Sequence, residues 1–114
     1  MTAATIKTFD VNDSGKTFIC NDVATTTGHL LPTAGAAGSG WHIRVIFSDA
    51  LADSTFTTTS NIVFSTLGKL AGATSTVITA AAALLAGDSF TLISDGTQFY
   101  GIGSTATTAA FTSA

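Results

Sequence analysis

The sequence predicts an all-β protein, a small antiparallel β-sandwich or jelly-roll-like domain of about eight or nine short strands. Short segments of alternating apolar and polar residues recur along the 114 residues, separated by Gly, Asp, Asn and Ser. Only 10% of the residues are charged and none is Glu, so the residues that usually solvate helices are scarce. Thr, Ala, Ser and Gly make up more than half of the chain, and the β-branch of Thr suits exposed strand faces. An open antiparallel sheet with a helix is the alternative fold.

The N-terminal half contains short strands joined by turns. Residues 12–15 predict a turn because Asn, Asp, Ser and Gly all favour turn positions. Gly28 is expected to close one strand, Pro32 to end any ladder that follows, and the small residues 33–40 to form a loop. The expected strands cover residues 5–9, 16–20, 23–27 and 41–47. In the strand over residues 41–47, alternation predicts which side chains face inward and which face outward. The side chains expected to face inward are Trp41, Ile43, Val45 and Phe47, and those expected to face outward are His42, Arg44 and Ile46.

The C-terminal half contains the clearest local signal. Apolar runs flank Asp95-Gly96, a dipeptide that readily takes positive φ, and this pattern predicts a β-hairpin. Gly87-Asp88 marks the turn that opens it. The other expected strands cover residues 55–59, 61–67 and 75–79, with Phe56, Ile62 and Phe64 inward. For residues 80–86 the alternatives are a helical turn and a plain connection between strands. For residues 105–111 they are a last strand and a tail that orders only on contact.

Charge and cysteine content narrow the classes of partner. The net charge is −3 and the four basic residues are spread singly, which disfavours nucleic acid. No apolar run approaches the ~18 residues of a membrane helix, so no membrane partner is expected. The single cysteine, Cys20, excludes an internal disulfide and fits folding in a reducing cytoplasm. The chain is expected to form one domain, residues 1–114, with residues 1–10 as an N-terminal arm and residues 104–114 as a flexible or contact-ordered tail.

The scarcity of charge also predicts assembly. A small domain usually keeps a mixed, charged surface to stay soluble. Few Lys residues and a single Pro are present to protect sheet edges from pairing with other chains. We therefore expect neighbouring copies to cover much of this surface. Solvation by Thr and Ser hydroxyls alone is the alternative.

No motif predicts a catalytic, metal or cofactor site. Gly15-Lys16-Thr17 resembles the end of a phosphate-binding loop, but the Gly required five residues earlier is Asp10. The segment from Asp10 to Gly15 resembles a calcium loop, but its twelfth position is Asn21 where a Glu is needed. The candidate zinc ligands are Cys20, His29 and His42, and their spacing matches no standard zinc site. No Gly-x-Ser-x-Gly elbow of a serine hydrolase occurs. Neither an enzyme nor a bound cofactor is expected. The aromatic residues that could stack on a sugar, Trp41 and Tyr100, are expected to pack in the core or at its rim instead.

Several turns and strand starts follow one another in a recognisable order: Asp13-Ser14-Gly15-Lys16, Leu31-Pro32 with the Ala/Gly loop after it, Gly40-Trp41, Gly87-Asp88 and the seven residues from Ser94 to Tyr100. This order resembles small structural proteins of tailed bacteriophages, namely capsid decoration (cement) proteins and the β-rich heads of fibres and spikes. The likeness covers roughly residues 13–103 and carries no catalytic signature. The usual Trp-Tyr pair of the last run appears here as Phe99-Tyr100.

This resemblance implies a virion component on the capsid exterior, made in the host bacterial cytoplasm and lacking an active site. Decoration proteins typically form homotrimers that bind the major capsid protein and stabilise its lattice. An N-terminal arm that contacts the capsid would include Thr5, Ile6, Lys7 and Phe9. A host-recognition fibre or spike head that binds a surface glycan is the alternative function. A minor capsid or tail-tube-like component is a third possibility.

Overall fold

The computed structural model describes residues 6–20, 27–48, 54–66, 69–80, 85–104 and 111–113, and these are mostly strands. The all-β prediction is confirmed. A single 3₁₀ turn, η1 (Val11–Asp13), and one short helix, α1 (Ala34–Ala37), complete the regular structure of this part of the chain. The eight strands it contains are β1 (Thr17–Cys20), β2 (Thr27–Leu30), β3 (Ser39–Phe47), β4 (Ser54–Thr66), β5 (Lys69–Ala80), β6 (Ser89–Asp95), β7 (Phe99–Ser104) and β8 (Phe111–Ser113).

The strands form one curled, mixed sheet, and the purely antiparallel arrangement expected from the sequence is wrong. Along the sheet the order is β1-β3-β6-β7-β4-β5-β8, and β2 pairs with β4 off this path. Three of the pairings are parallel: β1 with β3, β2 with β4, and β4 with β7. Parallel neighbours need a long crossover between them. Here β2 and α1 lie between β1 and β3 in the chain, and β5 and β6 lie between β4 and β7.

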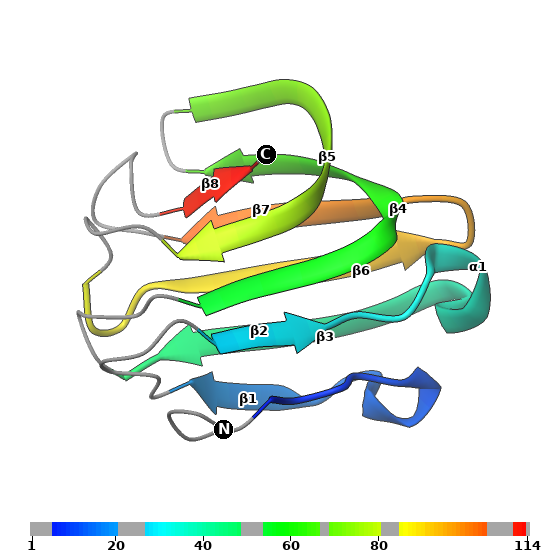
Figure 1. Ribbon diagram of the computed structural model, residues 1–114, viewed down its shortest axis with the longest axis horizontal. Helices are drawn as coiled ribbons and strands as arrows, with labels where there is room; N and C mark the ends of the chain where they lie inside the picture. The colour runs from blue at the N-terminus through cyan, green and yellow to red at the C-terminus, as the bar shows by residue number, and fades with distance from the viewer. Residues whose placement is uncertain are drawn as a thin grey trace.

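Strand β4 is the element that curls the sheet. Its first residues pair with β2 and its last residues pair with β7, while β5 follows it on the other side. The β4–β5 register shifts between Thr57 and Ile62, and such irregularities bend a strand. At this bend Thr58 Oγ1 donates to the Pro32 carbonyl at 2.8 Å. The strands expected over residues 55–59 and 61–67 are therefore one bent strand. Figure 1 shows β2 and the first half of β4 in front of β3 and β6.

The hydrophobic core fills the inner side of the curl. The alternation predicted for β3 is confirmed, since its four inward residues are at most 2% exposed while His42 and Arg44 are exposed. Phe56 on β4 lies over β3 and β6, with its ring centroid 5.0 Å from that of Phe90 and 6.2 Å from that of Phe47. Ile62 is also buried, as expected, whereas the side chain of Phe64 lies outside the described residues.

The hairpin prediction is confirmed as well. Strands β6 and β7 pair antiparallel, and Gly96 in the turn between them has φ +90°. Gly87 in the preceding turn also has positive φ, at +93°. Trp41 is buried, as expected for an aromatic residue that packs in the core, whereas Tyr100 is exposed on the outward side of β7 next to the buried Phe99.

Some local predictions need correction. Residues 33–40 are not a loop, because Thr33 caps α1 by accepting a hydrogen bond from the Ala36 N–H and β3 already begins at Ser39. Gly28 lies within β2 and does not close a strand. Of residues 6–9, only Thr8 makes a bridge, to Leu30, so they do not form the strand expected over residues 5–9. The strand expected over residues 75–79 begins earlier, at Lys69, and ends at Ala80. Most of the segments 23–27, 80–86 and 105–111 lies outside the described residues.

Candidate functional site

The segment predicted as a contact arm is held against the body of the domain from Lys7 onward. The Leu30 N–H donates to the Lys7 carbonyl at 3.0 Å, and the Phe9 N–H donates to the Leu30 carbonyl at 2.8 Å. Phe9 is 2% exposed and belongs to the core, whereas Ile6 is 62% exposed. Thr5 lies outside the described residues. Within the described chain, Ile6 is therefore the arm residue that is free to meet a partner.

A buried histidine helps to hold this segment. The backbone N–H of Lys7 donates to Nδ1 of His29 at 3.0 Å. His29 is fully buried on β2, and its ring centroid lies 4.9 Å from that of Phe56. A backbone N–H can only donate, so Nδ1 is the acceptor of this hydrogen bond. His29 thus has a structural role and is not placed as a metal ligand.

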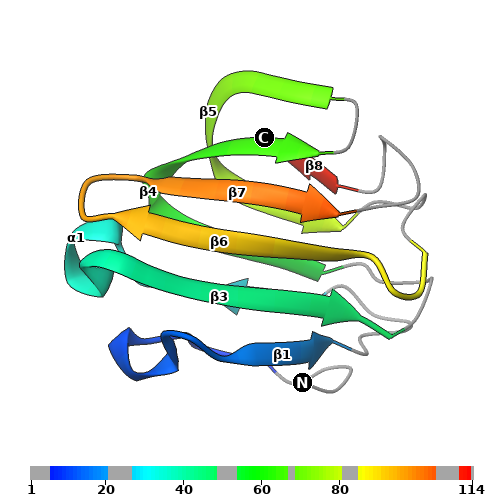
Figure 2. The same ribbon diagram turned by 180° about the vertical axis from the view of Figure 1, so that it is seen from behind.

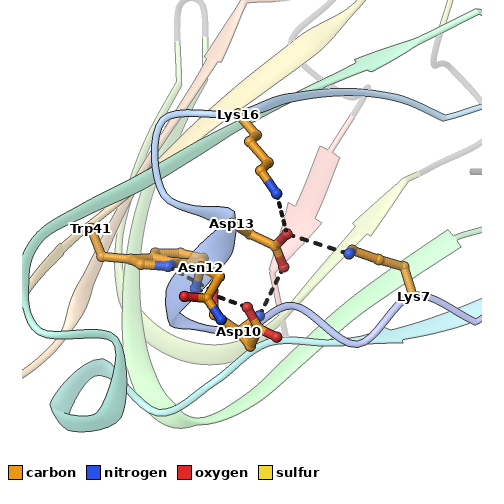
Figure 3. Close-up of polar contacts among 6 residues, drawn as sticks. All are labelled: Lys7, Asp10, Asn12, Asp13, Lys16 and Trp41. Carbon is orange, nitrogen blue, oxygen red and sulfur yellow. Dashed lines mark hydrogen bonds and ion pairs between the residues drawn. The ribbon is translucent and has the colours of Figure 1, made fainter.

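Asp13 is the centre of the polar cluster shown in Figure 3. Its carboxylate is buried and lies 3.4 Å from Lys7 Nζ and 3.6 Å from Lys16 Nζ. Its second oxygen accepts a hydrogen bond from the Asp10 N–H at 2.9 Å. Burial opposes ionisation of Asp13, but the Asp10 hydrogen bond and the two lysine charges together lower its pKa below the ordinary value.

The same cluster explains why the calcium-like sequence is a turn. The Asp10 carboxylate accepts from the Asn12 N–H at 2.8 Å, so Asp10 and Asp13 form a reciprocal capping box around η1. Trp41 Nε1 donates to the Asp10 carbonyl at 3.0 Å and ties the turn to β3. Because the Asp13 carboxylate is already balanced by Lys7 and Lys16, the cluster anchors the N-terminal segment and leaves no excess negative charge for a cation.

A second feature is the convex side of the sheet, which faces the viewer in Figure 2. We define the outer face as the outward side chains of β1, β3, β6 and β7. Four of its members are large apolar residues with 37% to 54% of their surface exposed, and the half-buried Ile46 adds to them. The outer face consists of Ile19, His42, Arg44, Ile46, Thr91, Ile93, Tyr100 and Ile102.

The strand register makes the outer face continuous. Ile93 lies opposite Tyr100, and Thr91 lies opposite Ile102 on the neighbouring strand. Arg44 pairs with the other side of Thr91. Side chains directly opposite on adjacent strands contact one another. The outer face is therefore an apolar and hydroxyl surface on which Arg44 carries a positive charge, and the exposed Asp95 lies on the same side at the end of β6.

Sequence reasoning singled out parts of this face but did not identify it as a surface. It placed His42, Arg44 and Ile46 outward on β3 and expected Tyr100 to pack in the core or at its rim. The signal for the rest was the Leu92-Ile93 pair, where a strand that is buried on one side carries an apolar residue on the other. Joining β1, β3, β6 and β7 into one surface requires the long-range pairings, which the alternation of one strand does not contain.

The predicted zinc candidates are not brought together. Cys20 is buried with its Sγ 3.7 Å from Ser54 Oγ, His29 faces Phe56, and His42 is exposed with Nδ1 3.0 Å from the Gly40 carbonyl oxygen. Among the described residues, no three His, Cys, Asp or Glu side chains gather where they could hold a metal. The described helices also include none with the length and apolar character needed to span a membrane.

No known protein family matches the chain, and neither a curated protein nor a solved structure is similar enough to match it.

Proposed function

We propose that the protein is a structural component of a tailed-bacteriophage virion, namely a capsid decoration protein that binds the major capsid lattice as a homotrimer. The observation that carries the proposal is the outer face. Four large apolar side chains on it are at least 37% exposed in a single copy. Exposed apolar surface that is continuous over several strands is typical of an interaction site.

The opposite side of the molecule supports the same function. Leu30 on β2 is 49% exposed. It forms the bridge with Thr8, which lies two residues after the exposed Ile6. A decoration protein needs two contacts, one with its own copies and one with the capsid. We assign the outer face to the first contact and the region around Ile6 and Leu30 to the second.

The proposed two-layered fold also suits a decoration protein. We infer that the curled sheet works as a jelly-roll-like, two-layered domain, with β2 and the first half of β4 covering β3 and β6. The ring contacts of Phe56 with Phe47 and Phe90 across the curl support this description. A domain packed in this way presents two broad, outward surfaces on opposite sides, which suits a protein that bridges neighbours.

A host-recognition head that binds a glycan is the second candidate. It is favoured by Tyr100, whose ring is 39% exposed on the outer face and whose hydroxyl accepts a hydrogen bond from Gln98 Nε2 at 2.8 Å. An exposed aromatic ring beside an amide is a common element of carbohydrate sites. The two functions differ in the number of copies that a particle carries.

The experiment is quantitative mass spectrometry of purified virions of the phage that encodes this sequence. A decoration protein is expected at hundreds of copies per particle, in fixed proportion to the major capsid protein, and electron cryomicroscopy should place it on the capsid exterior. Tens of copies at a tail tip would support the glycan-binding head instead. Absence of the chain from the particles would contradict both functions.

A further inference from the structure

Arg44 stands on the outer face and forms no ion pair with the described residues. It is exposed near the middle of β3, with Thr91 beside it on β6. The ion pairs among the described residues both involve Asp13, with Lys7 and Lys16, so Arg44 has none within that part of the chain. On the outer face Arg44 lies between Thr17 of β1 and Thr91 of β6, with Ile46 two residues along its own strand. A guanidinium beside hydroxyl and apolar side chains favours a partner that brings a carboxylate to the contact.

Asp95 is the complementary group. It is exposed at the end of β6, and its carboxylate accepts hydrogen bonds from the Thr97 and Gln98 N–H groups at 2.8 Å each. These bonds lower its pKa, so the group stays ionised and held in one orientation. Within the described chain no Lys or Arg forms an ion pair with it.

Asp10 is the other exposed carboxylate of the described residues. Its carboxylate accepts a hydrogen bond from the Asn12 N–H in the capping box of η1, which lies away from the β6–β7 turn in the sequence. Asp95 instead adjoins the outer face, since its strand carries Ile93 and its turn leads into Tyr100. A contact that covers the outer face can therefore reach Asp95 without leaving the apolar surface.

Arg44 and Asp95 do not meet within one chain. Arg44 is in register with Thr91, four residues before Asp95 on β6. At about 3.3 Å per residue the separation along the strand is about 13 Å. The two charges belong to the same surface but can neutralise one another only between different copies.

We propose that Arg44 of one copy pairs with Asp95 of a second copy, with the β6–β7 turn of one chain seated on the outer face of the next. The partner is thus a second copy of this chain, and the inference rests on the proposed trimeric assembly. A two-fold axis through the centre of the outer face would bring two Arg44 side chains within about 10 Å, the spacing of packed sheets. A cyclic contact avoids this repulsion because each copy offers its outer face to one neighbour and its turn to the other.

Charge reversal in the full-length chain tests the pairing, with sedimentation velocity at several protein concentrations as the readout. Arg44→Glu and Asp95→Lys should each weaken self-association at least about tenfold, because attraction becomes repulsion. The double variant should restore it to within about threefold of wild type. Thr59→Glu, which adds a negative charge at an exposed residue of β4 outside this surface, is the matched control and should associate normally.

Folding of each variant is checked by thermal melting. Asp95→Asn keeps an oxygen that can accept from Thr97 and Gln98, so it removes the charge while preserving the turn. It should weaken association in the same direction as Asp95→Lys, by a smaller factor. A weakened Asp95→Asn variant with an unchanged melting curve supports the pairing, and an unchanged association constant contradicts it.

The outcomes separate this pairing from the proposed function. Single reversals that associate like wild type, or a double variant no stronger than the singles, would overturn the pairing even if virions contain the protein in hundreds of copies. Rescue by the double variant supports it even if the virion copy number refutes a capsid role. A wild-type chain that never self-associates overturns it directly.

Discussion

The inner and outer sides of β3 and β6 carry alternate residues of the same two strands, yet they are under different constraints. On the inner side Val45, Phe90 and Leu92 are completely buried. On the outer side Arg44 is exposed and Ile93 is 37% exposed. The inner residues are apolar because folding requires their burial. Folding of a single copy does not require the outer residues to be apolar, so their character points to contacts outside the chain.

The largest effect should come from Phe90→Ala on the inner side. The ring contacts Phe47 and Phe56, and its removal leaves a cavity, so the free energy of unfolding should fall by about 3–5 kcal/mol. Urea unfolding should show this loss at every protein concentration. Ile93→Ala, three residues along the same strand, is the matched outer variant. Its cost should grow with protein concentration, because the proposed association would bury that residue in the assembly. Equal, concentration-independent costs would remove the distinction between the two sides.

Asp13→Asn should produce the next largest effect, since Asp13 is the buried polar group that anchors the N-terminal segment. The substitution leaves Lys7 and Lys16 without their shared carboxylate and should lower the free energy of unfolding at neutral pH by about 1–3 kcal/mol. Hydrogen exchange of the Phe9 and Leu30 amides should accelerate selectively. Unchanged exchange at these amides would show that the cluster does not hold the segment.

The pH dependence of stability tests the same cluster with a definite sign. Because folding lowers the pKa of Asp13, its contribution is complete above the unfolded pKa of about 3.9 and is lost as the pH falls through the lower folded value. Wild type should therefore lose stability below about pH 4. Asp13→Asn should show a shallower decline over that range, measured by urea unfolding. Parallel curves for the two proteins would contradict the assignment.

Gly96→Ala tests the turn that positions Asp95. Gly96 has φ +90°, a region that Ala adopts only with strain, and the added Cβ would meet Ser39 at no less than 3.5 Å. The cost should therefore come from backbone strain and amount to about 1 kcal/mol in the free energy of unfolding. Gly35→Ala on α1, where φ is not positive, is the control and should not carry this cost.

The smallest effect on stability should come from Ile102→Ser on the outer face. In dilute solution the free energy of unfolding should change by less than about 0.5 kcal/mol, because the side chain is already 54% exposed. Self-association should nevertheless weaken measurably in sedimentation. A variant that loses several kcal/mol in dilute solution would place Ile102 in the core of the single chain.

The sequence predicted what depends on local rules. The alternation of β3, the positive φ of Gly96 and the turn before Lys16 follow from side-chain periodicity and backbone sterics. The bend of β4 was not predicted, because the contact made there, from the Thr58 hydroxyl to the Pro32 carbonyl, joins residues that are distant in the sequence. Parallel pairing was missed for the same reason, since it depends on where the chain returns and not on any one strand.

The candidate site also contains features that local sequence rules predict and features that depend on long-range contacts. The sequence placed Phe9 in an arm that would contact the capsid, but Phe9 is buried against Phe18 on β1 and Phe56 on β4, which are distant in the sequence. The alternation of residues along β3 predicted correctly that Arg44 faces outward. Its relation to Asp95 required the β3–β6 register, which places the two charges on one surface and about 13 Å apart.

The mass of the wild-type protein in solution tests most directly the claim that this surface exists for assembly. Multi-angle light scattering across a hundredfold dilution should give about 34 kDa, three times the 11.4 kDa of one chain, with dissociation only at the lowest concentrations. A mass of 11.4 kDa at every concentration would contradict the account.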